Sequence, residues 1–170
     1  MTEVAGKKRG RETALDMIRS LAIVFALVVP LWFLGQASPG DGKRIRPVDP
    51  APALQGFARD TGTAVPSGTP AGWVVNVARA ESGGVRIGYV VGEQYTEFVA
   101  GRGETFLDDI TGKGKEQGGV DVNGVPWRVL ISAEGQESLV RTAGAYTLVV
   151  GGVRESVARA QLKTLAATVR

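Results

Sequence analysis

The sequence contains neither cysteine nor histidine, and both absences narrow the chemistry open to the protein. Without cysteine the chain cannot form a disulfide, a thiolate metal site or a lipid-modified cysteine. Without histidine it has no Ser-His-Asp or Cys-His unit and no histidine general base. We therefore expect no metal ion, no cofactor and no enzymatic activity, although catalysis by carboxylates alone stays open.

The chain also lacks a concentrated basic region outside its N-terminus. Residues 1–19 carry five basic side chains against three acidic ones, whereas the residues from Ser38 onward carry 15 basic and 14 acidic ones, a net charge of +1. Nucleic-acid-binding domains normally present a dense basic face, because neutralisation of phosphates dominates their affinity. The sequence therefore predicts no nucleic-acid partner.

One segment lacks charge altogether. No charged residue occurs between Ser20 and Gly40, a stretch composed largely of apolar side chains. A helix over residues 20–37 would be about 27 Å long, against a hydrocarbon core of about 30 Å. Arg19 can extend back to the headgroups, and Trp32 lies near the far end, where aromatic rings favour the membrane interface. We expect a single transmembrane helix over 20–37 that attaches the chain to the membrane.

The charges beside this segment predict its orientation, because positive residues hold a flank on the cytoplasmic side. Four basic residues in the preceding tail carry that signal: Lys7, Lys8, Arg9 and Arg11. We expect residues 1–19 to be cytoplasmic and the C-terminal domain to be extracytoplasmic. A cleaved signal peptide is the alternative, because Gly35-Gln36-Ala37 fits a small-x-small cleavage pattern. The domain is exported in either case.

The rest of the chain divides into a stalk and one domain. Residues 38–52 hold four prolines among polar and charged residues, which predicts a semi-extended stalk. Residues 53–170 are enough for one hydrophobic core and form the predicted extracytoplasmic domain. A short helix is expected after Pro52, where Leu54 and Phe57 recur at helical spacing.

Within this domain, apolar residues alternate in two groups of three strands, each followed by a helical pattern. The first group is 73–77, 85–91 and 95–100 with a helix at 103–110; the second is 127–131, 139–141 and 146–150 with a helix at 153–170. Asn123-Gly124 predicts a hairpin turn, and the Gly- and Lys-rich residues 112–119 predict a loop. The fold class is therefore α+β, with an antiparallel sheet of about six strands from two β-β-β-α units and helices on one face.

Three features resemble functional motifs without meeting their requirements. Asp108-Asp109 is the only adjacent acidic pair, and helix neighbours do not share a face, so we interpret it as a solvated surface. The sequences 101–103 and 112–115 lack the spacing of a phosphate-binding loop, so we interpret them as flexible turns. Five aromatic residues fit core packing, with a ligand groove as the alternative: Trp73, Tyr89, Tyr95, Trp127 and Tyr146. We predict no catalytic, cofactor-binding or metal-binding residue.

Several short motifs along the chain occur in a fixed order. They are Arg19-Ser20-Leu21, Gly72-Trp73, Arg86-Ile87-Gly88-Tyr89, Gly124-Val125-Pro126-Trp127, Leu139-Val140-Arg141, the Tyr146–Gly151 run and the Leu165–Arg170 run. In this order the chain resembles an actinobacterial family of membrane-anchored proteins, the domain of unknown function numbered forty-two forty-five. The resemblance covers nearly the whole chain and implies the topology above, but no activity, substrate or cofactor.

The sequence therefore favours a single-pass membrane protein with an extracytoplasmic domain that is a non-enzymatic interaction protein of the cell envelope. Its partner would be another envelope protein, whose identity the sequence does not give. The alternative is a binding module that holds a small or lipid-like ligand in a cavity between sheet and helices.

Overall fold

The computed structural model describes residues 17–18, 21–22, 24–26, 28–29, 46–81, 83–152 and 157–170. The chain divides into two units, Met1–Arg44 and Ile45–Arg170, and each is described by itself. The described residues of the first unit, 17–18, 21–22, 24–26 and 28–29, are all helical and exposed.

The predicted membrane helix over 20–37 lies largely outside the described residues, as do the tail before Met17 and most of the predicted stalk. Within the described residues, no helix has both the length and the apolar character needed to cross a membrane. The predicted span therefore stays a prediction.

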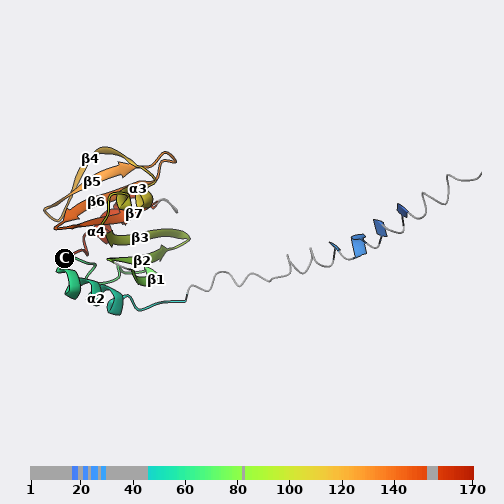
Figure 1. Cartoon of the computed structure of the whole chain (residues 1–170), viewed down its shortest axis with the longest axis horizontal. Coiled ribbons are helices and arrows are strands. Elements are labelled where there is room, and N and C mark those ends of the chain that lie inside the picture. Colours follow the sequence, from blue (N-terminus) through green and yellow to red (C-terminus); the bar gives the residue numbers. More distant parts are fainter. Residues whose placement is uncertain are drawn as a thin grey trace, which may run out of the picture. The chain divides into compact units, whose positions relative to one another are not determined.

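The described residues of the second unit form one antiparallel sheet of seven strands in the order β1-β2-β3-β7-β6-β5-β4 (Figure 1). The strands are β1 (Val74–Glu81), β2 (Gly84–Val91), β3 (Gln94–Gly101), β4 (Lys115–Val122), β5 (Val125–Ile131), β6 (Glu137–Ala143) and β7 (Tyr146–Gly151). Two hairpin-connected groups, β1-β2-β3 and β4-β5-β6-β7, meet where β3 pairs with β7. The prediction of an antiparallel α+β fold is confirmed.

The predicted number of about six strands is wrong, because residues 115–119 belong to β4 and not to a loop. The Asn123-Gly124 turn folds β4 back onto β5, so Val120 pairs with Trp127 and Val122 with Val125. Gly118 has a φ of +115° in an irregularity of the β4 register, so the glycines permit a bulge within the strand and do not end it.

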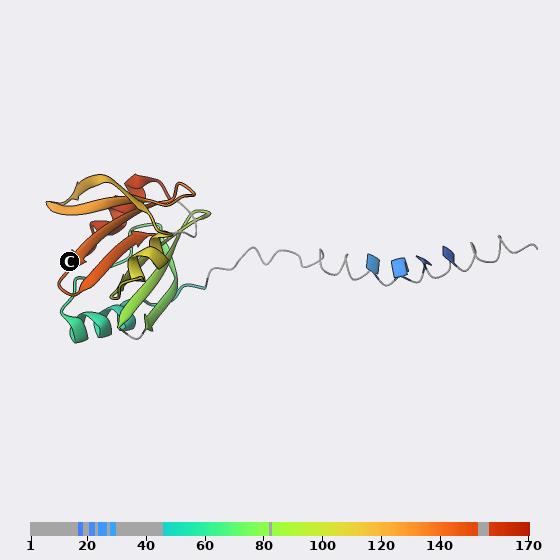
Figure 2. The ribbon, with the colours of Figure 1, turned by 45° about the horizontal axis from the view of Figure 1, so that its top comes forward.

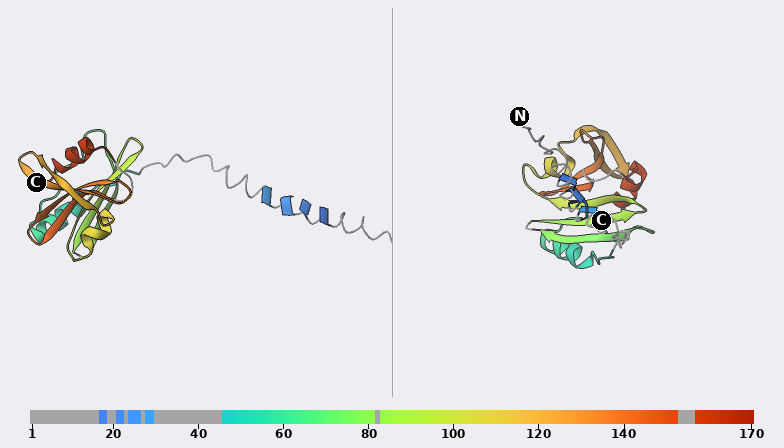
Figure 3. Two further views of the ribbon diagram at one scale, coloured as in Figure 1. Left: turned by 90° about the horizontal axis from the view of Figure 1, so that it is seen from above. Right: turned by 90° about the vertical axis from the view of Figure 1, so that its right-hand side faces the viewer.

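The helices cover both faces of the sheet, which corrects the prediction that they share one face. Helix α2 (Ala51–Thr61) packs on β1 and β2, and α4 (Arg159–Ala166) on β6 and β7. Their side chains join the main core, whereas α3 (Phe106–Thr111) contacts a separate cluster on the other face. Figure 2 shows α3 in front of the sheet and α4 behind it, and Figure 3 shows the same separation from above.

The main core contains the side chains that alternation predicted for the second half, including Trp127, Val129 and Leu139. Its cross-strand layers join β5, β6 and β7 through pairs such as Val129 with Leu139 and Leu139 with Val150. Leu162 and Leu165 of α4 are fully buried against this layer. The predicted covering of the sheet by the C-terminal helix is therefore confirmed.

The first half departs from the predicted pattern at β1. Val75 pairs with Tyr89 but Val77 pairs with its neighbour Gly88, so one extra residue forms a bulge between them. A bulge turns the following side chains to the opposite face, so Val77 does not share the core face of Val75, as strict alternation over 73–77 would require. Trp73 precedes β1 and is half-buried, whereas Trp127 lies inside β5 and is buried, so the two rings are not equivalent.

The C-terminal helix is shorter than the predicted range 153–170. Residues 153–156 lie outside the described residues, and α4 ends at Ala166. Beyond it, Val169 forms an antiparallel bridge with Pro66. The backbone of Val65 and Arg170 exchanges two hydrogen bonds, each of 3.1 Å. This final segment therefore pairs as a short strand with the chain that follows α2.

Candidate functional site

The residues that resembled functional motifs in the sequence lie in separate places. Asp108 and Asp109 are exposed in the first turn of α3, as expected of a solvated helix face. Gly112 ends α3 in a left-handed conformation with a φ of +60°, and Lys113 follows at +56°. These two positions form a turn, as predicted.

Gly101 is not part of a flexible turn, which corrects the interpretation of residues 101–103. It is the buried last residue of β3, and the Phe106 ring of α3 lies directly over it. A Cβ atom at Gly101 would lie 2.4 Å from a ring carbon of Phe106. The glycine therefore makes room for α3 to pack on the sheet.

Four of the five aromatic residues, all except Tyr95, belong to the main core or pack against it. Tyr89 is fully buried, and Trp73 packs edge-on against it at a ring distance of 5.9 Å. Tyr146 packs edge-on against Phe57 of α2 at 5.2 Å. Tyr95 lies on the opposite face of β3 from Phe98, so it does not join the other four. Core packing explains the set, with Tyr95 as the exception.

Burial raises the pKa of the Tyr89 phenol above its ordinary value. Its hydroxyl oxygen and the Thr96 hydroxyl have no hydrogen-bond partner among the described residues. A phenol that stays protonated in an apolar core cannot serve as a base near neutral pH. Tyr89 therefore contributes packing and not acid–base chemistry.

A buried carboxylate on the α3 face was missed by the sequence analysis. Glu97 of β3 is 3% exposed, and Arg86 Nη1 on the neighbouring strand lies 3.2 and 3.3 Å from its two carboxylate oxygens. The Tyr95 hydroxyl lies 3.5 Å from Glu97 Oε2. Glu97 alternates with apolar residues along β3, which is also the pattern of a solvent-facing strand residue. The sequence signal was therefore ambiguous.

The residues around Glu97 make space for its side chain and pair its buried charge. Gly152 makes room for Glu97, because a Cβ atom on Gly152 would lie 2.9 Å from Glu97 Oε1. Arginine is suited to such a pair because its planar fork can bind both carboxylate oxygens. Among the described residues Glu97 is the only buried acidic side chain, and no three acidic side chains form a metal-binding group. The part of the chain described here thus brings together no pair of buried carboxylates.

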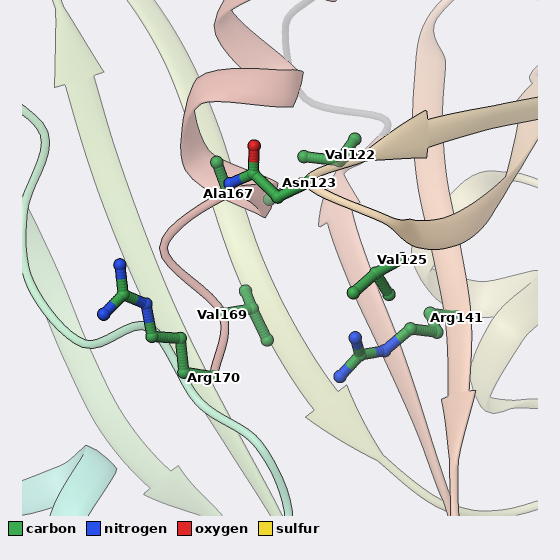
Figure 4. Close-up of a pocket in the computed structure, with 8 residues that line it drawn as sticks. Val122, Asn123, Val125, Arg141, Ala167, Val169 and Arg170 are labelled. Carbon is green, nitrogen blue, oxygen red and sulfur yellow. The ribbon is translucent and has the colours of Figure 1, made fainter.

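A pocket of about 230 Å³ lies on the other side of the sheet, between the β4–β5 hairpin, β6 and the chain after α4 (Figure 4). It is lined by Val122, Asn123, Val125, Arg141, Ala166, Ala167, Val169 and Arg170. None of these eight residues is acidic, and two carry positive charge. The pocket therefore combines aliphatic side chains with two guanidinium groups.

Arg141 is the charged residue that points across this pocket. It pairs with Leu148 in the sheet register, on the side that faces the main core. Its guanidinium carbon lies 5.2 Å from the centre of the Trp127 ring, within the range of a cation–π contact. In Figure 4 the Arg141 side chain extends toward Val169, whereas the Arg170 guanidinium points away from it. Neither arginine has an ion pair among the described residues.

The sequence did not predict this pocket. Arg141 was interpreted as part of an alternating strand, and nothing in the sequence places it beside Asn123 or Ala167. The pairing of β4 with β5 and the return of the chain after α4 create that neighbourhood. A positive residue at a core-facing strand position was the one available signal.

Comparison with known proteins identifies the family. The family described as "Protein of unknown function (DUF4245)" matches residues 9–169, which is nearly the whole chain. No curated protein and no solved structure matches the chain. The match agrees with the resemblance that the ordered sequence motifs carried, and the chain belongs to the DUF4245 family.

Proposed function

We propose that this chain is a single-pass membrane protein whose extracytoplasmic domain acts by binding, without catalysis, in the cell envelope. The observation that carries the proposal is where large apolar side chains remain exposed. Within the described residues, seven of the eight such side chains belong to the first unit: Met17, Ile18, Leu21, Val24, Phe25, Val28 and Val29. Val48 is the eighth, so the described part of the second unit has nearly all of its large apolar side chains covered.

The proposal explains this difference by two environments, with lipid around the apolar helical residues of the first unit and water around the domain. Leu21 and Phe25 are each 58% exposed on residues that are helical in the structure. Exposed apolar surface costs about 25 cal/mol per Å² in water, and a bilayer removes that cost. The sequence has no charged residue from Ser20 to Gly40, including the positions that lie outside the described residues. A membrane anchor followed by a folded, water-facing domain accounts for both halves of the pattern.

The basic residues of the tail support a cytoplasmic N-terminus and an extracytoplasmic domain. A composition rich in alanine, glycine, valine and arginine suits a high-GC bacterium. A binding role is supported by the absence of histidine and cysteine from the sequence and by the single buried carboxylate of the described residues. The partner class that follows is another envelope component, a protein or a ligand.

A second candidate function is favoured by the pocket beside Arg141. The sequence analysis gave a binding module for a small or lipid-like ligand as the alternative function. The pocket between the sheet and the chain after α4 is the place where such a ligand would bind. Its volume of about 230 Å³ is below the usual range of about 300–1,000 Å³ for drug-sized ligands, so it suits a small head group.

The proposed orientation predicts the outcome of limited proteolysis on intact cells. A protease added to spheroplasts should remove the domain at residues 46–170, because the basic tail holds the N-terminus inside. An epitope tag placed before Met1 should survive as a small membrane-bound fragment, detected by immunoblotting. Protection of the domain until the membrane is lysed would contradict the orientation.

Retention in the membrane is a separate prediction. If residues 20–37 are an uncleaved anchor, the mature protein should begin at or near Met1 and stay with membranes in high salt, because apolar insertion is not screened. N-terminal sequencing and membrane fractionation measure both properties. A mature N-terminus at Ser38 in the culture fluid would instead identify Gly35-Gln36-Ala37 as a cleavage site.

A further inference from the structure

Arg141 is an unusual cation for its position in the sheet. Its neighbours along the same face of β6, Leu139 and Ala143, belong to the main core or pack against it. A charge at a half-buried site normally has a carboxylate partner, because partial removal from water is costly. Arg141 has the Trp127 ring and no ion pair among the described residues. In Figure 4 its guanidinium group extends toward Val169, another residue that lines the pocket.

We propose that this pocket binds a phosphate group carried by a small organic molecule or by a lipid headgroup. The inference rests on the proposed binding function and names the chemistry of the ligand. Arg141 supplies a planar fork of N–H donors, which binds oxyanions through paired hydrogen bonds. Its cation–π contact with Trp127 restricts the guanidinium group, which reduces the side-chain freedom lost when the anion binds.

The other walls of the pocket favour an anion with an organic group attached over a simple carboxylate such as acetate. Asn123 lies on the hairpin side, and in Figure 4 its amide extends toward Ala167, so it can hydrogen-bond a polar group at the far end of the ligand and not the anion beside Arg141. The Arg170 guanidinium points away from Arg141, so it supplies no second fork for the same anion. Val125 and Val169 give the carbon-bearing side of the ligand an apolar surface.

The size of the pocket limits the ligand further. A volume of about 230 Å³ is several times the roughly 30 Å³ share of one water molecule, so it holds a phosphate with a few attached atoms. It does not hold a drug-sized molecule. A glycerol phosphate group fits this description both as a free molecule and as the headgroup of a phospholipid.

The test uses the full chain in nonionic detergent micelles and isothermal titration calorimetry. Glycerol 3-phosphate is one probe, dioctanoyl phosphatidylglycerol added to the micelles is the second, and acetate is the third. Saturable binding of glycerol 3-phosphate assigns a free phosphate ester, and binding of the lipid probe alone assigns a headgroup. Either result supports the proposal. Saturable binding of acetate alone, or of no probe at millimolar concentration, overturns it.

Variants decide whether Arg141 is responsible. Arg141→Gln should weaken binding of the active probe at least tenfold, and Arg141→Lys should retain part of it, because a lysine keeps the charge but loses the fork. Arg128→Gln is the matched control. Arg128 lies on β5, is exposed and pairs with Glu116 on the other face of the sheet. The Arg128→Gln variant should therefore bind the probe with the same affinity as the parent. Equal affinity of Arg141→Gln and the parent would refute the role of Arg141.

Filling the pocket provides a test that leaves the arginine in place. Ala167 lines the same space, so the larger side chain of Ala167→Leu should also weaken binding at least tenfold. Denaturant midpoints show whether each variant is folded. The probe should raise the unfolding midpoint of the parent but not that of Ala167→Leu. Unchanged binding in this variant would overturn the location. These measurements use purified protein, so their failure leaves the topology and retention predictions untouched.

Discussion

Replacing Trp127 by alanine is expected to lower the free energy of unfolding of the domain by about 3–5 kcal/mol, the usual cost of removing a buried Trp. Trp127 is 2% exposed in the main core, and its ring makes a cation–π contact with Arg141. A loss of this size is a large share of the roughly 5–15 kcal/mol available to a domain. Denaturant unfolding of the fragment 43–170, followed by fluorescence, measures the change.

Trp73→Ala is the matched comparison and should cost clearly less, because Trp73 is half-buried and precedes β1. Leu165→Ala should resemble Trp127→Ala, with a cost of about 2–5 kcal/mol, since Leu165 is fully buried in α4. Glu134→Ala, at an exposed position, should unfold like the parent. Equal midpoints for Trp127→Ala and Glu134→Ala would mean that the Trp127 ring is not a core residue.

Sequence periodicity predicted the strands whose partners are close along the chain. Asn123 and Gly124 have φ angles of +54° and +79°, which are those of the tight hairpin turn that this dipeptide predicts. The same reasoning missed β4, because composition rich in glycine and lysine was given more weight than pairing across the turn. Val120 and Val122 alternate toward the core opposite Trp127 and Val125, and that alternation was available in the sequence.

Other features depend on elements that are distant in the sequence. The bulge in β1 is defined by its register against β2, so Val77 cannot be assigned to a face from its own strand. The side of the sheet on which α3 lies is set by Phe106 packing over Gly101. A helix of six residues has an apolar side that fits either face, so its sequence does not choose.

The polar sites were harder to predict than the core for the same reason. Glu97 is buried because Arg86 on the next strand and the open space at Gly152 lie beside it. Arg141 lines a pocket because a hairpin and the chain beyond α4 approach it from two directions. Alternation shows which face a residue is on, but three-dimensional neighbours decide whether a charge on that face is paired, solvated or open to a ligand.

Two glycine-to-alanine substitutions should change stability in opposite directions. Gly151 ends β7 with a φ of +106°, and a Cβ atom there would lie 2.7 Å from the Glu137 carbonyl oxygen and 3.1 Å from Ser138 Cα. Both contacts are with the backbone of β6, which cannot turn away as a side chain would. Gly56 lies inside α2, and a Cβ atom there would meet no atom within 4 Å.

Gly151→Ala is therefore expected to destabilise the domain by about 2–6 kcal/mol, from about 1–3 kcal/mol of backbone strain and a similar cost of overpacking. Gly56→Ala should stabilise it by about 0.5–1 kcal/mol, because alanine loses less backbone entropy in a helix and meets no clash. Urea unfolding of the fragment 43–170 with each substitution measures both values against the same parent. A Gly151→Ala variant as stable as the parent would show that β7 can rotate at this residue without breaking its pairing with β6. A loss of stability in Gly56→Ala would mean that the exposed side of this helix position is covered by a part of the chain outside the described residues.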